Sequence, residues 1–318
     1  MKYSGIGGQA VIEGIMMMKG EDYAVAVRRP DKEIEVKKDT YQSITKKAKI
    51  LQLPFVRGVF RFADSMIIGM RSLTYSASFF EDDEDAEPGK FEQFLDRVFG
   101  EKLESAIMAA VLVISFILAI AIFMLLPLGI ANLFKGVITS DHLMAVLEGV
   151  IRIAIFIIYI KLVSRMEDIR RTFMYHGAEH KCINCVEHGH PLTVKYVRES
   201  SKEHKRCGTS FILIVMVISI LMFMVIRVDT IWMRILSRII LVPVIAGISY
   251  EVLQCAGRSN SKFMDLVSRP GMWMQGLTTK EPDDSMIEVA IAATEAVFDW
   301  REYLTENFPG WEKQLEES

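Results

Sequence analysis

The residues best able to do chemistry lie in one stretch, "HGAEHKCINC", which spans residues 176–185. His176 and His180 are four residues apart, so on a helix both imidazoles project from one face, and Glu179 projects beside them. H-x-x-E-H is the inverse of the zincin motif. In enzymes that use either motif, two histidines bind zinc and the glutamate is the base for a water that the zinc acidifies. The stretch predicts a divalent metal site, with zinc as the expected ion.

A zinc site needs at least a third protein ligand, and a catalytic one also needs an open coordination position. His204 and Glu251 are equal candidates for this ligand, because both lie near the cytosolic end of a predicted span and an acidic residue inside a span is costly. We expect Lys181 or Arg206 to stabilise an anionic intermediate or a phosphate group. Three further candidates for the site are Gln9, Glu13 and Cys207.

The cysteines offer a competing, structural site. Cys182-x-x-Cys185 and His204-x-x-Cys207 have the spacing of a closed pair of zinc knuckles. A simpler alternative is that His176 and His180 only cap or pack at a membrane interface. All four cysteines fall in predicted cytosolic segments or at their membrane edge, where free thiols or metal ligands are expected rather than disulfides.

Four long apolar segments must position these residues. The strongest runs from Ser105 to Phe134 without a charged residue, about thirty positions where about twenty span a bilayer. Weaker spans are expected at 143–163, 208–226 and 235–253. In the second span Glu148 and Arg152 can pair as i,i+4 neighbours, and in the fourth Pro243 permits a re-entrant or tilted element. The sequence predicts an α-helical polytopic membrane protein with about four transmembrane helices.

Charge predicts the orientation of these spans. Basic residues are concentrated in the loop 164–207, whereas the link between the first two spans offers only Lys135. The first hundred residues show no signal-peptide pattern, so we expect a multi-pass protein of the cell membrane with both termini cytosolic. A net charge of -3 excludes general nucleic-acid electrostatics. The expected partners are membrane lipid, a membrane-borne substrate and, in a homo-oligomer, further copies of the chain.

The other segments flank the span domain, residues 105–258. Alternating runs around Pro30 predict a β hairpin in a small cytosolic α+β N-terminal region, 1–50. Residues 51–80 predict an amphipathic helix, interfacial or buried. An acidic linker and helix lead-in are expected at 81–104, and a cytosolic helical region at 259–318.

The motif itself is expected to lie on a helix that continues the second span through "MEDIRRTFMY" into the cytosol. Gly177 lowers helix propensity by about 1 kcal/mol relative to alanine. It therefore needs a reason, such as the close approach of another element.

Over nearly its whole length the chain resembles the YqhQ-like family of bacterial multi-pass membrane proteins. The resemblance is carried by "GGQAVIEGIMMM", "LPFVRGVFRFADSMIIGM", "YHGAEHKCIN", "HKRCGTSFILIVMVIS", "LVPVIAGISYEVL" and "PGMWMQGLTTKEPDDSMIEVAIAA". It implies a metal-dependent enzyme without a defined activity. Cys182 and Cys185 fit the family pattern less well, which disfavours the zinc knuckles. The positions inside family motifs are Gln9, Glu13, His176, Glu179, His180, Lys181, His204, Arg206, Cys207, Tyr250 and Glu251.

Two functions follow as hypotheses. The first is a membrane-embedded, metal-dependent hydrolase with its site at the cytosolic membrane edge, acting on a peptide or a lipid-linked molecule. The second is a non-enzymatic scaffold, assembly or transport-related protein whose polar cluster is a structural or binding site.

Overall fold

The computed structural model describes residues 1–80, 103–204, 206–226, 230–258 and 261–316. The chain divides into two compact units, one made of residues 1–80, 160–219 and 228–318, the other of 81–159 and 220–227. The expected acidic linker lies outside the described residues up to position 102.

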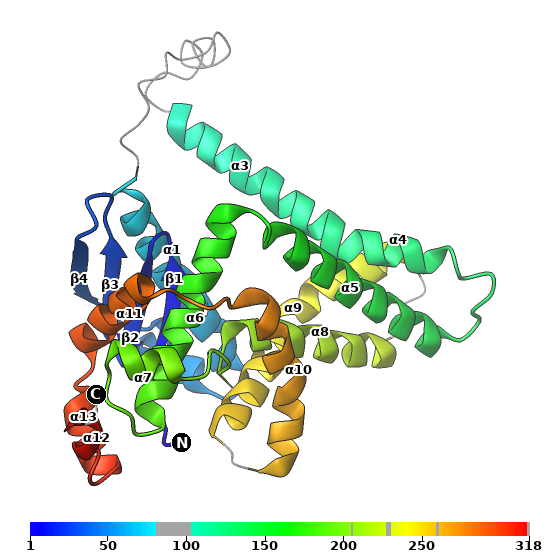
Figure 1. The fold of residues 1–318 in the computed structure, drawn as a ribbon. Coiled ribbons are helices and arrows are strands. Elements are labelled where there is room, and N and C mark those ends of the chain that lie inside the picture. The colour runs from blue at the N-terminus through cyan, green and yellow to red at the C-terminus, as the bar shows by residue number, and fades with distance from the viewer. Residues whose placement is uncertain (81–102, 205, 227–229, 259–260, 317–318) are drawn as a thin grey trace. The chain divides into compact units, whose positions relative to one another are not determined.

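The first unit is built on a four-stranded antiparallel sheet in chain order (Figure 1). Its strands are β1 (Ile6–Val11), β2 (Gly14–Lys19), β3 (Asp22–Arg28) and β4 (Ile34–Thr40). β3 and β4 form the hairpin predicted around Pro30, with Arg28 opposite Ile34. The alternation of side chains along each strand gives the sheet two buried faces.

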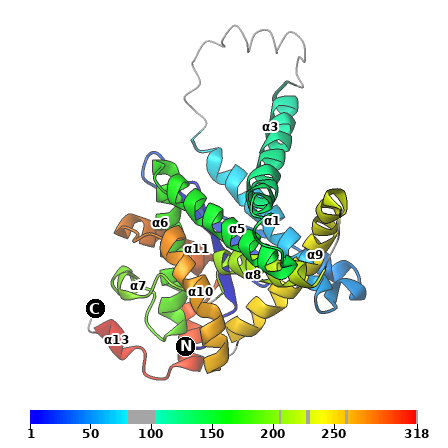
Figure 2. The ribbon, with the colours of Figure 1, turned by 90° about the vertical axis from the view of Figure 1, so that its right-hand side faces the viewer.

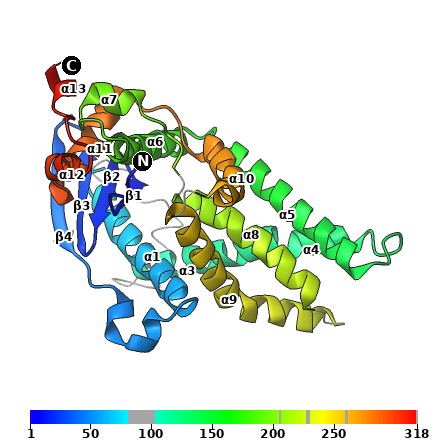
Figure 3. The same ribbon diagram turned by 90° about the horizontal axis from the view of Figure 1, so that it is seen from below.

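Helices cover both faces of this sheet. Ile15 and Met17 point to one face, where they pack with α6 (Glu167–Glu187) and α11 (Asp284–Val297). Met16 and Val25 point to the other, where they pack with Ile68 of α1. Figure 3 shows α1 on one side of the strands and α6 and α11 on the other. The same side as α6 also carries α7 (Val194–Glu199), α12 (Trp300–Asn307) and α13 (Lys313–Glu316).

The amphipathic helix expected within residues 51–80 is α1 (Val56–Ala77), which follows the 3₁₀ turns η1 (Ile44–Lys47) and η2 (Lys49–Gln52). One of its faces, with Ile68, Gly69 and Ser72, is buried. The opposite face exposes large apolar side chains, including Met66 and Met70. It therefore has the two apolar surfaces of a helix that packs on a sheet and also offers a face to another apolar phase.

Three longer helices, α8 (Gly208–Val225), α9 (Ile231–Arg258) and α10 (Lys262–Thr278), follow the loop after α7 (Figure 2). Helix α9 runs through Pro243 without interruption. It is therefore one continuous helix rather than a re-entrant element.

The second unit holds α3 (Leu103–Ile120), a π-helical turn η4 (Ala121–Leu125), α4 (Leu126–Asn132) and most of α5 (Asp141–Val163). Pro127 has no N–H to donate to the carbonyl four residues earlier, which accounts for the π turn at this point. The pair predicted on α5 is confirmed, because Arg152 Nη2 lies 2.7 Å from Glu148 Oε1.

Among the described residues, four helices are long and apolar enough to cross a membrane: Val113–Asn132, Asp141–Val163, Gly208–Val225 and Ile235–Gly257. They lie where the sequence predicts them. The prediction that α5 continues into the histidine motif is wrong. Helix α5 ends at Val163, Met166 has extended backbone, and α6 starts afresh at Glu167. Glu167 and Asp168 in its first turn favour a new helix N-terminus there. The direction of α6 is consequently set by the sheet and not by the span.

Candidate metal centre

The C-terminal half of α6 is almost wholly buried, although it carries the polar and charged residues of the H-x-x-E-H motif. One side packs on the sheet and α11, and the other meets the segment after α10. At Gly177 a Cβ would lie 2.0 Å from the carbonyl oxygen of Lys280. The N–H of Lys280 donates to the carbonyl of Phe173 at 2.8 Å. The predicted reason for the glycine, close approach of another element, is confirmed.

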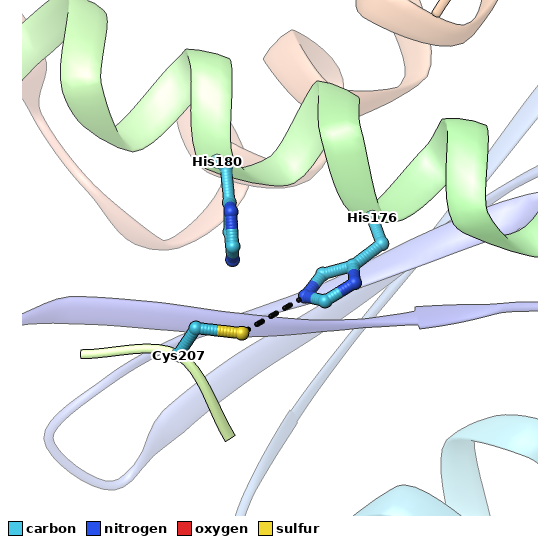
Figure 4. A group of neighbouring side chains, drawn as sticks. All are labelled: His176, His180 and Cys207. Atoms are coloured by element: carbon cyan, nitrogen blue, oxygen red, sulfur yellow. Dashed lines mark hydrogen bonds between the residues drawn. The ribbon is translucent and has the colours of Figure 1, made fainter. Parts of the chain in front are cut away.

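His176 and His180 project from the same face of α6, as the spacing predicts (Figure 4). Nδ1 of His176 lies 3.0 Å from the carbonyl oxygen of Thr278, and Nδ1 of His180 lies 2.7 Å from that of Lys202. Because a carbonyl can only accept, both Nδ1 atoms must carry the proton. In the neutral rings both Nε2 atoms are then left with a lone pair, the arrangement typical of histidines that bind a metal through Nε2.

Cys207 brings a sulfur to these two nitrogens from the loop before α8. Its Sγ lies 3.3 Å from Nε2 of His176 and accepts the N–H of Thr209 at 3.3 Å. Figure 4 shows the thiol directed at the His176 ring below α6. The sulfur lies at the N-terminal end of α8, where a helix dipole favours the negative charge of a metal-bound thiolate.

Two imidazoles and one thiolate are the ligand types that zinc prefers. The ligand atoms of His176, His180 and Cys207 all lie within 4.8 Å of one another. Ligands of tetrahedral zinc lie about 3.3–3.6 Å apart, as its bond lengths require. The Cys207–His176 pair already meets this separation, and the widest pair would need to close by about 1 Å. The residues present therefore fit a three-ligand zinc site with one position left open.

Glu179 is buried beside this group with half of its carboxylate unused. Its carboxylate accepts the backbone N–H of Gly8 on β1, while Oε2 has no hydrogen-bond partner among the described residues. Burial raises the pKa of Glu179 to about 7, an effect that the nearby His176 and the Gly8 N–H partly offset. A Cβ at Gly8 would lie 2.9 Å from Glu179 Cγ. The glycine thus makes room on the sheet for the one carboxylate of the H-x-x-E-H motif.

Lys181 and Asn184, which follow the motif on α6, hold the loop that carries the other site residues. Lys181 Nζ donates to the carbonyls of Arg198 and Ser200 and pairs with Glu281 at 2.5 Å. The Nδ2 of Asn184 donates to the carbonyls of Ser201 and Glu203 at 2.7 and 2.8 Å. All three protons of the Lys181 ammonium are accounted for. The lysine therefore positions the loop and has no donor left for an anionic intermediate.

Arg206 and His204 meet at a second buried carboxylate, Glu187 at the end of α6. Glu187 accepts from Arg206, from both the N–H and hydroxyl of Ser4, and lies 3.5 Å from His204 Nε2. Burial alone would raise the pKa of Glu187, but the contacts with His204, Arg206 and Ser4 lower it to about 2. Burial lowers the pKa of His204, which favours its neutral form.

The structure does not bring the two expected third ligands into the metal group. The His204 ring lies 5.8 Å from that of His180 between centroids, but its Nε2 faces Glu187. Glu251 places both carboxylate oxygens on Arg57, at 2.7 and 2.5 Å, and also accepts the Phe55 N–H. Cys207 takes the third position instead.

Gln9 and Glu13 lie outside the group as well. The Gln9 side chain packs against Gly69 of α1, on the face of the sheet away from α6. Glu13 occupies the turn after β1 and pairs with Arg171 at 2.5 and 2.6 Å. It also accepts the Tyr175 hydroxyl at 3.3 Å. Glu13 anchors the first half of α6 to the sheet.

The zinc-knuckle alternative is not assembled in the structure. Cys182 and Cys185 are fully buried in the core between the sheet, α6 and α11. Burial raises the pKa of both thiols, that of Cys185 to about 12. The Sγ of Cys185 contacts the carbonyl of Pro191 at 3.3 Å. All four cysteines are free, as expected.

Sequence reasoning missed two polar residues that build the site. Asn184 lies in the stretch 176–185, but its distance along the chain from the histidines matches no known metal-site motif. Gln275 lies on α10. The fully buried Gln275 amide accepts the His204 N–H at 2.8 Å and donates to the His204 carbonyl at 2.7 Å. Polar residues that bind loop backbone leave no periodic signal. The one available hint is that an amide flanked by apolar residues needs a partner when it is buried.

Comparison with known proteins identifies relatives but no activity. A protein-family model described as "Protein of unknown function (DUF1385)" matches residues 53–300. A curated protein from Bacillus subtilis (strain 168), described as "Uncharacterized protein YqhQ", is 34% identical over 286 residues, which cover 90% of this chain and 89% of that protein. No solved structure matches the chain. These matches confirm the resemblance that the quoted motifs carry.

Proposed function

The chain belongs to the DUF1385 family, and we propose that it is a membrane-embedded zinc hydrolase whose metal is held by His176, His180 and Cys207. One observation carries the proposal. Both imidazoles are fixed by backbone carbonyls through Nδ1, while their Nε2 atoms converge with a thiol within 4.8 Å. Such second contacts fix the tautomer and ring orientation of metal ligands.

The unpaired oxygen of Glu179 supports a hydrolytic role over simple binding. Zinc with an open position acts as a Lewis acid that lowers the pKa of a water molecule. Glu179 would accept a proton from that water while the water oxygen bonds to the electrophilic centre of the substrate. It would then return the proton to the leaving group. The Gly8 N–H fixes one carboxylate oxygen, so Oε2 is the atom that exchanges the proton.

Contacts between the chain ends support a cell-membrane topology with both termini in the cytosol. The N–H of Lys2 donates to the Glu187 carbonyl, and the Tyr303 hydroxyl donates to the Lys2 carbonyl. In a chain that spans a membrane, these contacts require the two ends and α6 to lie on the same side of it. Four crossings satisfy this, and the basic residues of the loop 164–207 assign that side to the cytosol.

A structural metal site is the second candidate, and the pairing of the two cations favours it. Two loop carbonyls and Glu281 take all three protons of the Lys181 ammonium, so this lysine has no donor left for an anionic intermediate. Arg206 pairs with Glu187, and its Nη1 has no hydrogen-bond partner among the described residues. A closed site that fastens the loop to α6 would need only a fourth ligand in place of an open position.

Metal analysis tests the binding part of the proposal. The full chain purified in nanodiscs should contain one zinc per chain, and His176→Ala, His180→Ala and Cys207→Ala should each lower this to about a tenth or less. The matched variants Cys182→Ala and Glu251→Gln should keep the zinc. A wild-type protein without stoichiometric zinc would rule the proposal out.

Cobalt substitution separates the two candidates without a known substrate. In the cobalt(II) form, adding acetohydroxamate should change the visible d–d bands, because the probe can enter an open coordination position. Bands that do not respond would establish a closed site and exclude the hydrolase. In a screen of ester and peptide substrates presented in vesicles, Glu179→Gln should retain zinc and lose at least about 100-fold in turnover.

A further inference from the structure

An apolar groove lies between α8, α9 and α10. It has a volume of about 300 Å³. Its walls include Leu213 and Val217 of α8, Leu253 and Ala256 of α9, and Pro270 of α10. The three helices lie side by side in Figures 2 and 3. This volume is at the lower end of the range for ligand pockets and suits one narrow occupant.

The polar end of the groove adjoins the metal group. Ser210 lines the groove, and its N–H donates to the carbonyl of Cys207 at 3.1 Å. The Ser210 hydroxyl accepts from Gln275 Nε2 at 2.9 Å. The same amide donates to the carbonyl of His204. One helical turn of α8 therefore separates Ser210, at the polar end of the groove, from the Cys207 ligand.

The chemistry of the walls selects the kind of occupant. The helical backbones of α8 and α9 satisfy their own hydrogen bonds, and the Ser268 hydroxyl donates to the Met264 carbonyl at 2.8 Å. A peptide strand in this groove would bury N–H and carbonyl groups without partners, which is strongly unfavourable in an apolar surrounding. A hydrocarbon chain has no such groups. Helices α8 and α9 are also two of the four candidate membrane spans. In a membrane the groove would therefore adjoin the hydrocarbon core of the bilayer.

We propose that the groove between α8, α9 and α10 binds the hydrocarbon chain of a lipid-linked substrate and presents its head group to His176, His180 and Cys207. This rests on the proposed zinc hydrolase and selects a lipid-linked substrate over a peptide. The chain enters from the bilayer between the two spans. Ser210 marks the point at which the apolar part of the substrate ends.

Photolabelling in vesicles tests the groove directly. The probe is phosphatidylglycerol with a diazirine in one acyl chain, added to the full protein in vesicles of unlabelled phosphatidylglycerol. On irradiation, label should concentrate on the groove residues of α8 and α9. Val217→Trp should lower this labelling at least about tenfold. Ile212→Trp is the matched control, because Ile212 is 42% exposed and Val217 44% exposed on the same helix, but Ile212 does not line the groove.

Zinc measured in the same samples keeps the two proposals apart. Groove labelling that Val217→Trp removes, with zinc retained in every sample, supports the inference. Label spread evenly over the lipid-facing helices, or unaffected by Val217→Trp, overturns the groove and leaves the zinc hydrolase standing. Groove labelling in a protein that holds no zinc overturns the substrate assignment together with the hydrolase.

Discussion

At the scale of single residues, two backbone carbonyls prepare the histidines of α6 for a metal. The oxygens of Thr278 and Lys202 fix the Nδ1 protons and thereby aim both Nε2 lone pairs at Cys207. A backbone carbonyl is present whatever side chain its residue carries. The second contacts of the site are therefore insensitive to substitution at these positions and depend instead on how closely the chain approaches α6.

Gly177→Ala tests that approach. A Cβ at 2.0 Å from the Lys280 carbonyl oxygen forces the segment after α10 away from α6, which should cost about 1–3 kcal/mol of unfolding free energy and weaken zinc binding through the lost Thr278 contact. Gly276→Ala is the control, because a Cβ there meets nothing within 4 Å and should add up to about 1 kcal/mol of helix propensity. Denaturant unfolding measures both. Equal stability of the two variants would contradict the close packing.

The buried carboxylate of Glu187 makes stability depend on acid pH. Its pKa of about 2 in the folded chain lies below the usual 4.5, so its stabilising effect is complete above about pH 4.5 and is lost as pH falls toward 2. Over that interval the loss should reach about 3 kcal/mol.

Glu187→Gln should be destabilised by about 3–5 kcal/mol at pH 7, because Arg206 is left buried without its carboxylate. The deficit relative to the wild type should shrink as the pH is lowered from 5 to 3. Urea unfolding at several pH values measures the difference, with the exposed Glu306→Gln as control. A deficit that stays constant with pH would show that Glu187 does not titrate in this way.

At the scale of elements, α6 combines anchoring and chemistry along its length. Glu13 fixes its first half through Arg171, and the H-x-x-E-H residues occupy its middle. Lys181 and Asn184 then donate hydrogen bonds to carbonyls of the loop 198–203. Because Cys207 follows that loop, the loop must be held for the third ligand to reach the histidines.

Lys181→Met should therefore lower zinc affinity without removing a ligand, by about 10–100-fold. Competition with a chelating dye measures it. Lys202→Met removes a half-buried lysine that approaches the same Glu281 at 3.7 Å and should leave the affinity within about twofold, because the loop carbonyls do not depend on its ammonium group. If both variants bound zinc as tightly as the wild type, the loop would not be positioned by Lys181.

Features that depend on a local pattern of residues were predictable from the sequence, and features that depend on contacts between distant segments were not. The four long apolar helices, the hairpin around Pro30 and the helix α1 follow from local patterns of hydrophobicity, and all are present as secondary structure. The third ligand was not predictable in the same way. Glu251 and His204 are as suitable as Cys207 by residue type, but Arg57 and Glu187 already engage them. Which polar residue is already paired depends on contacts between distant segments, and so does the break between α5 and α6.

At the scale of the whole molecule, the N-terminal sheet and the C-terminal helices form one unit with α6, which lies between the second and third spans. If the four candidate helices cross a membrane, such a unit requires the first two to return the chain to the side on which it started, and the last two to do the same. The fold of the first unit thus constrains topology independently of the distribution of basic residues.

Accessibility labelling tests this constraint. In a Cys255→Ser background, cysteines at Lys32 and Glu306 should react with a membrane-impermeant maleimide only in inside-out vesicles, since both lie in the first unit. A cysteine at Gly136, between α4 and α5, should react only in right-side-out vesicles. If Lys32→Cys and Glu306→Cys reacted on opposite sides, the number of crossings would be odd and the contacts of Lys2 with Glu187 and Tyr303 could not form in the membrane. If Gly136→Cys reacted on the same side as Lys32→Cys and Glu306→Cys, the candidate spans Val113–Asn132 and Asp141–Val163 would form a hairpin that does not cross the membrane. Only α8 and α9 would then be inserted.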